Sequence, residues 1–196
     1  MNEFIFYVTE GFKHVLDLRV NSLDHVLFFI LMAVPYTVES WKKAFYASLA
    51  FTLGHTISII LSVYDVVAVN AAYVEFLILA TIVITALFNI LRAGKSPSGG
   101  IDWFILIATL VFGLIHGFGF ASTFEMLASG VDSKILLLLE FALGIELGQL
   151  AVIFIVLLFV FLATRMTRLP RRDWNLVISS IILGVVLPML VERWVF

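Results

Sequence analysis

The chain has 196 residues, of which 62% are hydrophobic and 13% are charged, and its mean hydropathy is +1.12. Soluble domains average about 45–50% apolar and about 25% charged residues, so this composition excludes an ordinary soluble domain. The formal charge of -2 gives no basis for nucleic-acid binding, and the lack of cysteine excludes disulfides and thiolate metal sites.

Apolar runs bounded by charged residues, Pro and Gly predict an all-α, polytopic membrane bundle of about six transmembrane helices. A shorter segment, Phe4–Leu16, comes first; it has an apolar stripe, but it is too short to span easily and predicts an interfacial or re-entrant helix. The predicted spans are Ser22–Val38, Trp41–Tyr64, Ala71–Leu91, Ile101–Phe124, Ser133–Thr164 and Trp174–Trp194. We therefore expect residues 1–196 to form one membrane domain in the lipid bilayer, with residues 1–20 as an N-terminal interfacial segment.

The fifth predicted span is longer than a membrane crossing requires. About 20 residues cross the bilayer, so this run of roughly 30 residues must tilt, kink or project beyond it. Gly144 and Gly148 lie within it and mark a bend or a close contact with another helix.

Basic residues in the connecting segments predict the orientation. They lie in the first, third and fifth connections, which share one side of the membrane; they are Lys42, Lys43, Arg92, Lys95, Arg165, Arg168, Arg171 and Arg172. Because cytoplasmic connections are enriched in Lys and Arg, that side is expected to be cytoplasmic, with both termini outside.

Several ionisable residues lie within the predicted spans, where each costs roughly 2.5–3.5 kcal/mol on insertion scales and suggests a functional site. At a rise of 1.5 Å per residue, six of them fall within roughly the outer 15 Å of the membrane. These six are Asp24, His25, His55, Glu75, His116 and Glu140. Imidazoles with one or two carboxylates suit Ni, Co, Zn or Fe(II). We therefore predict a site for a divalent transition metal in the outer half of the bundle.

Neighbouring residues extend this prediction. Thr52 lies one turn from His55 and is placed to orient the ring as a partner behind the metal ligand. Glu146 and Gln149 share a helical face but lie deeper than Glu140, so they would form a further station along an ion path. Asn89 is a further polar residue on the predicted route inward.

Each of these residues also has a structural interpretation. A single histidine in a membrane helix often serves only as an interhelical hydrogen-bonding residue. Glu75 lies near a helix N-terminus, where the helix dipole favours a carboxylate, and Asp24 is a candidate N-cap together with Ser22.

Six segments resemble the HupE/UreJ family of small bacterial membrane proteins, which are associated with hydrogenase and urease systems and regarded as nickel or cobalt permeases. The matching segments are Gly11–Asp17 (GFKHVLD), Leu23–Phe29 (LDHVLFF), Phe51–His55 (FTLGH), Val74–Ile78 (VEFLI), Phe112–Phe120 (FGLIHGFGF) and Gly144–Gln149 (GIELGQ). The resemblance implies a protein of the bacterial inner membrane.

The resemblance also implies roles for individual residues. His14, Asp24 and His25 correspond to the family's His-x5-Asp-His signature, His116 to its His-Gly element, and Glu146 to the acidic element of the fifth helix. Nine residues rather than five separate His14 from Asp24 in this chain.

Three functions remain open at this point. The first is binding and transport of a divalent metal, which needs a polar route inward; the sequence has no nucleotide-binding motif to drive it. The second is an intramembrane zinc hydrolase acting on a lipid-like substrate, which needs a lipid-sized opening beside the metal and an acid to activate its water. The third is a structural or sensory site with a closed four-ligand sphere. The sequence leaves the metal and the oligomeric state open, a homo-oligomer included.

Overall fold

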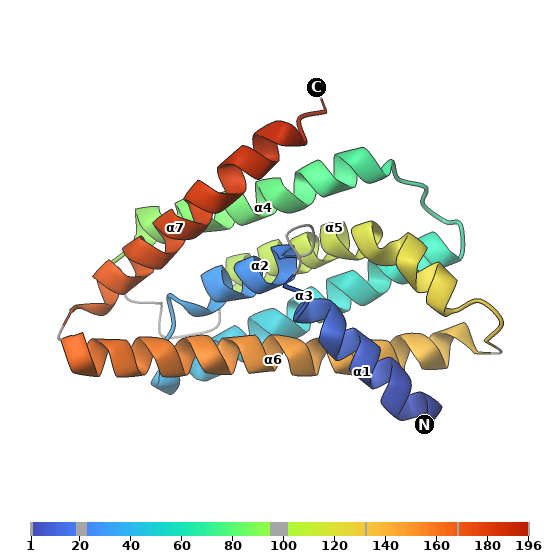
Figure 1. The fold of residues 1–196 in the computed structure, drawn as a ribbon, viewed down its shortest axis with the longest axis horizontal. Helices are drawn as coiled ribbons and strands as arrows, with labels where there is room; N and C mark the ends of the chain where they lie inside the picture. The colour runs from blue at the N-terminus through green and yellow to red at the C-terminus, as the bar shows by residue number, and fades with distance from the viewer. Residues whose placement is uncertain (1, 19–22, 95–101, 132, 168, 196) are drawn as a thin grey trace.

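The computed structural model describes residues 2–18, 23–94, 102–131, 133–167 and 169–195, and this part of the chain is all-helical, as predicted (Figure 1). The elements in chain order are α1 (Glu3–Val15), α2 (Asp24–Ala33), the 3-10 helix η2 (Val38–Ser40), α3 (Trp41–Val63), α4 (Ala71–Arg92), α5 (Trp103–Leu127), α6 (Lys134–Thr167) and α7 (Arg171–Glu192).

Five helices, α3 to α7, are long and apolar enough to cross a membrane. Their observed ends lie within a few residues of the predicted spans, except for the predicted start Ile101, which falls outside the described residues. The first predicted span differs. Its start, Ser22, is also outside the described residues, and the helix within it, α2, has only ten residues, or about 15 Å of length. It ends just before Pro35, which cannot continue the helical hydrogen bonding.

The two short helices α1 and α2 follow one another along the length of the bundle (Figure 1). α1 starts at the end of the bundle where α6 starts and runs parallel to it: a Cβ on Gly144 would meet the Val8 carbonyl, and a Cβ on Gly148 would meet Val15. Since Val15 is the last residue of α1, this helix ends beside the middle of α6. Gly144 and Gly148 are therefore places of close helix contact, one of the two alternatives expected.

Glycines also bring α3 and α5 together. A Cβ on Gly54 would lie 2.1 Å from the Leu110 carbonyl oxygen, and one on Gly117 would lie 2.4 Å from the His55 carbonyl oxygen. Such distances leave no space for a side chain, so the two backbones touch directly. This contact lies beside two histidines, because Gly117 directly follows His116 and meets the backbone carbonyl of His55.

Polar contacts tie the remaining helices together. The Asn89 Nδ2 group of α4 donates to the Leu31 carbonyl of α2 at 2.7 Å, and the Asn175 Nδ2 group of α7 donates to the Asn89 carbonyl at 3.3 Å. At the other end of α4, Glu75 Oε2 lies 3.2 Å from Arg193 Nη1. The pair α4–α7 is therefore antiparallel and fastened at both ends.

The glycine contact between α1 and α6 predicts the effect of Gly144→Ala. The new methyl group would meet the Val8 carbonyl oxygen at 2.1 Å, and overpacking of this kind costs roughly 1–3 kcal/mol. We expect a lower melting temperature for the purified protein in detergent. Gly184→Ala is the matched control, because nothing lies within 4 Å of its new Cβ and Ala is favoured over Gly in a helix by roughly 0.5–1 kcal/mol. Equal melting temperatures for the two variants would contradict the contact.

Candidate metal centre

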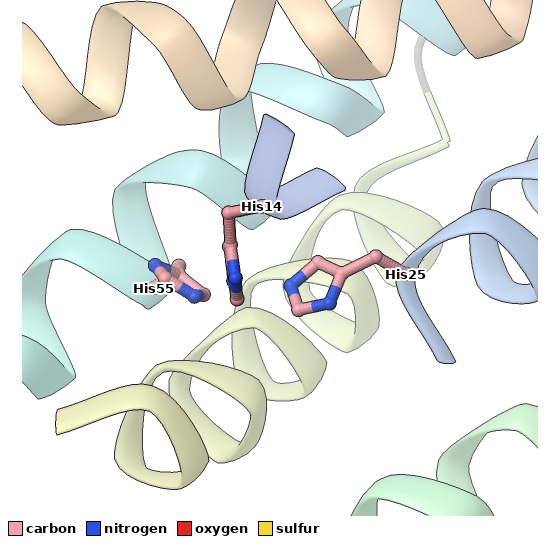
Figure 2. A group of neighbouring side chains, drawn as sticks. All are labelled: His14, His25 and His55. Atoms are coloured by element: carbon pink, nitrogen blue, oxygen red, sulfur yellow. The ribbon is translucent and has the colours of Figure 1, made fainter. Parts of the chain in front are cut away.

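All four histidines of the chain meet in the interior of the bundle. His14 lies in the last turn of α1 and His25 in the first turn of α2, while His55 lies on α3. One ligand nitrogen from each of these three residues lies within 4.8 Å of the other two. Figure 2 shows the three side chains entering the same space from separate helices. His116 of α5 adjoins them, with its ring centroid 5.3 Å from that of His25.

The place of each histidine on its helix follows from local sequence. The break between α1 and α2 places His14 and His25 next to each other, with ring centroids 4.5 Å apart, so the nine-residue spacing still brings the two together. The glycine contact of α3 with α5 does the same for His55 and His116. Four helices from separate parts of the sequence, α1, α2, α3 and α5, thus contribute to one site near the middle of the bundle.

Aromatic side chains enclose the cluster. His55 and His116 have relative exposures of 0% and 1%. The centroid of the Phe51 ring lies 5.0 Å from that of His116 and 6.1 Å from that of His55. The centroid of the Phe120 ring lies 4.0 Å from that of His14. Electrostatic and coordination interactions are stronger in such low-dielectric surroundings than in water.

The imidazole nitrogens of this cluster lack hydrogen-bond partners among the described residues. Each of the four rings has a buried Nε2 without a partner, and the Nδ1 of His55 has none either. Buried polar atoms in proteins are nearly always satisfied, so an exception needs an explanation. Several unsatisfied imidazoles aimed into one space are typical of a metal-binding site, since neutral imidazole is the commonest metal ligand among side chains.

Two of the rings are held by their other nitrogen. The Nδ1 of His116 donates to the Phe112 carbonyl at 2.8 Å, one helical turn earlier. The Nδ1 of His25 lies 3.3 Å from Asp24 Oδ1, which also accepts the backbone N–H of His25 at 2.9 Å. In each case the hydrogen bond at Nδ1 leaves the lone pair on Nε2 for a ligand and fixes the ring. Asp24 therefore acts on His25 rather than as a separate member of the three-histidine group.

The other predicted carboxylates lie elsewhere. Among the described residues, the group of mutually close ligand atoms consists of histidines and does not include Glu140. Glu75 is exposed and pairs with Arg193, in line with its structural interpretation at a helix end. Asn89 bonds to the Leu31 carbonyl between α4 and α2. A shared depth in the membrane, which grouped Glu75 and Glu140 with the histidines in the sequence, does not specify the direction in which a side chain points.

A second polar cluster lies between α3 and α6. The hydroxyl groups of Ser48 and Thr52 donate to the two carboxylate oxygens of Glu146, at 2.5 and 2.7 Å. Thr52 Oγ1 is also 3.1 Å from Oε1 of Gln149, whose buried Nε2 has no partner among the described residues. Thr52 thus contacts this cluster and not the His55 ring. Sequence reasoning missed Ser48, although it lies four residues before Thr52 and so shares its helical face.

The contact of Asp24 with His25 predicts the effect of Asp24→Asn. The amide keeps the size of the side chain but removes the charge that holds the Nδ1 proton, and loss of such a partner typically weakens metal affinity by roughly 10–100-fold. We expect weakening in that range for Co²⁺ or Zn²⁺ titrated into the purified protein by calorimetry. Glu75→Gln is the control, because it removes a carboxylate bound to Arg193 instead. An unchanged metal affinity in Asp24→Asn would contradict a role of Asp24 in metal binding.

Comparison with known proteins finds a matching family model. A family model described as HupE / UreJ protein matches residues 1–194, which include all four histidines and the Glu146 cluster. No curated protein and no solved structure matches the sequence. With five helices that are long and apolar enough to cross a membrane, the match identifies an integral membrane protein. The chain therefore belongs to the HupE/UreJ family, as the sequence motifs predicted.

Proposed function

We propose that this protein binds a divalent transition-metal ion and transports it across the membrane. The observation that carries the proposal is the cluster of four imidazoles whose buried nitrogens have no partner among the described residues. The family is generally related to nickel and cobalt transport. Imidazole is a suitable ligand for these two ions, and also for Zn²⁺ and Fe²⁺. The cluster would be the place where the ion leaves its hydration shell.

The ligand set supports transport over a purely structural site. His14, His25 and His55 provide three close nitrogens, and a three-ligand site keeps a position open for water or for the next ligand. An ion in transit must be released as well as bound, so incomplete coordination is an advantage. His116, next to His25, is the nearest further imidazole to which an ion would pass.

The Glu146 cluster supplies the next step. Ser48 and Thr52 lie one to two turns before His55 on α3, so the carboxylate that they bind lies further towards the start of that helix. Glu146, Gln149 and the two hydroxyl groups offer oxygen ligands within one cluster. We propose that the ion passes from the imidazoles to this cluster along the contact between α3 and α6.

The surroundings of the histidines favour transport over lipid hydrolysis. A cavity of about 640 Å³ is lined by residues of α2, α4, α5 and α7, and its inner wall includes Phe28 and Phe112. The Phe28 ring lies 5.5 Å from the His116 ring, between centroids. The aromatic side chains thus stand between the lipid-sized cavity and the imidazoles, where a hydrolase would need direct access.

We also propose the orientation expected from the sequence. α1 and α2 together run along the bundle as one interrupted crossing (Figure 1), and half-helices of this kind often form ion sites at their break. With α3 to α7 this gives six crossings, both termini outside and the basic connections in the cytoplasm of a bacterial inner membrane. Lys95 and Arg168, which support this orientation, lie outside the described residues.

Metal uptake into proteoliposomes tests the proposal. We expect the wild type to take up Ni²⁺ or Co²⁺, and Glu146→Gln to lower the rate at least tenfold while the metal still binds at the histidines. Glu125→Gln, which changes an exposed carboxylate of α5, should transport normally. Absence of uptake of Ni²⁺, Co²⁺, Zn²⁺ and Fe²⁺ by well-folded wild-type protein that binds one of these ions would contradict transport and leave a binding or structural site.

A further inference from the structure

The cavity beside the metal centre has a basic mouth. Of the charged residues that line it, four are cationic and one is acidic; they are Lys43, Arg92, Arg171, Arg172 and Asp102. All five lie at or near the end of the bundle where α3, α5 and α7 begin and α4 ends. A free divalent cation is repelled by such a mouth, so the cavity is not a natural continuation of the metal path.

The cationic side chains of the mouth are only partly neutralised. Arg92 stacks on the Phe88 ring at 4.7 Å and lies 3.5 Å from Asp102 Oδ2. Arg171 donates to the Pro35 carbonyl, which is neutral, and it also interacts electrostatically with the exposed Glu39, without an ion pair to it within the described part of the chain. Arg172 extends past Gly94, with its Cδ 3.1 Å from the position of a Cβ there, and forms no ion pair within the described part of the chain. At least two guanidinium groups therefore remain for an anion.

The inner part of the cavity is mostly apolar, with Thr85, Asn89, Thr109 and Asn175 as its polar lining residues, and it opens towards the lipid. Its walls include Phe28, Met32, Phe88 and Phe112. Two further lining residues, Ile84 of α4 and Phe104 of α5, have relative exposures of 54% and 67%. The cavity thus reaches the outer surface of the helices between α4 and α5. A volume of about 640 Å³ is within the range of roughly 300–1,000 Å³ that is typical of small-ligand sites.

We propose that this cavity binds an anionic phospholipid, with an acyl chain along the aromatic wall and the phosphate at Arg171 and Arg172. Three features fit this ligand: the bilayer borders the opening at Ile84 and Phe104, the wall is apolar, and the mouth carries an excess of positive charge. Basic pockets between membrane helices are known to hold anionic lipid head groups, because Lys and Arg near the membrane surface attract anionic lipid.

Native mass spectrometry of the detergent-purified protein tests the proposal. We expect phosphatidylglycerol to bind with a stoichiometry of one, at least tenfold more tightly than phosphatidylcholine with the same acyl chains, and Arg172→Gln to remove most of this preference. Arg165→Gln is the matched control: Arg165 is an exposed arginine near the end of α6, stacked on Phe161 and absent from the cavity lining. It should bind phosphatidylglycerol as the wild type does.

A second variant and a second ligand make the outcome decisive. Ala108→Phe fills the cavity from its wall without changing its charge, and it should abolish one-to-one binding while the melting temperature shows that the variant is folded. Should Ala108→Phe not fold, the comparison of Arg172→Gln with Arg165→Gln still decides. Equal binding of the two phospholipids, or equal losses in Arg172→Gln and Arg165→Gln, would overturn the proposal. Tighter binding of palmitate than of phosphatidylglycerol would also overturn the proposal, because the ligand of the cavity would then be a free fatty acid.

Discussion

A buried polar group left without a hydrogen bond costs roughly 1–3 kcal/mol, and five imidazole nitrogens of this chain are buried without a partner among the described residues. They belong to the only four histidines in the sequence and face one another from α1, α2, α3 and α5. A fold that gathers these rings from separate helices needs something to compensate for their desolvation. A metal ion does so most directly, because each unpartnered nitrogen can supply a lone pair to it, and this requirement connects the fold to the proposed function.

Glycine contacts and the break between α1 and α2 create the geometry that the histidines need. α1 reaches only the middle of α6, where Gly144 and Gly148 receive it, and its last turn carries His14. The direct contact of α3 with α5 brings in His55 and His116. Because α3 also carries Ser48 and Thr52, the same helix links the imidazoles to Glu146. The imidazoles thus come from four helices, and α3 joins them to the oxygen ligands around Glu146.

Much of this could be predicted from the sequence. Hydropathy located the five long helices, and the placement of His25, His55 and His116 at a common depth indicated their meeting, because depth follows directly from position along a helix. The length of α2 was not predicted correctly, because a hydropathy window runs through Pro35, whereas the helix ends before it. Glu75 was predicted at the depth of the histidines but pairs with Arg193, Glu140 does not belong to the three-histidine group of the described residues, and Thr52 binds Glu146 instead of His55. Direction depends on tertiary packing, which in this bundle is set by glycine contacts that no periodicity specifies.

The measurement that tests the central claim most directly is the metal content of the purified protein, by elemental analysis and anomalous scattering, in the wild type, His55→Ala and His116→Ala. We expect a stoichiometric divalent transition metal in the wild type, positioned among His14, His25 and His55, and its loss or marked depletion in both variants. Well-folded wild-type protein that contains no metal, even after addition of Ni²⁺, Co²⁺, Zn²⁺ and Fe²⁺, would contradict it and make the four histidines a structural cluster.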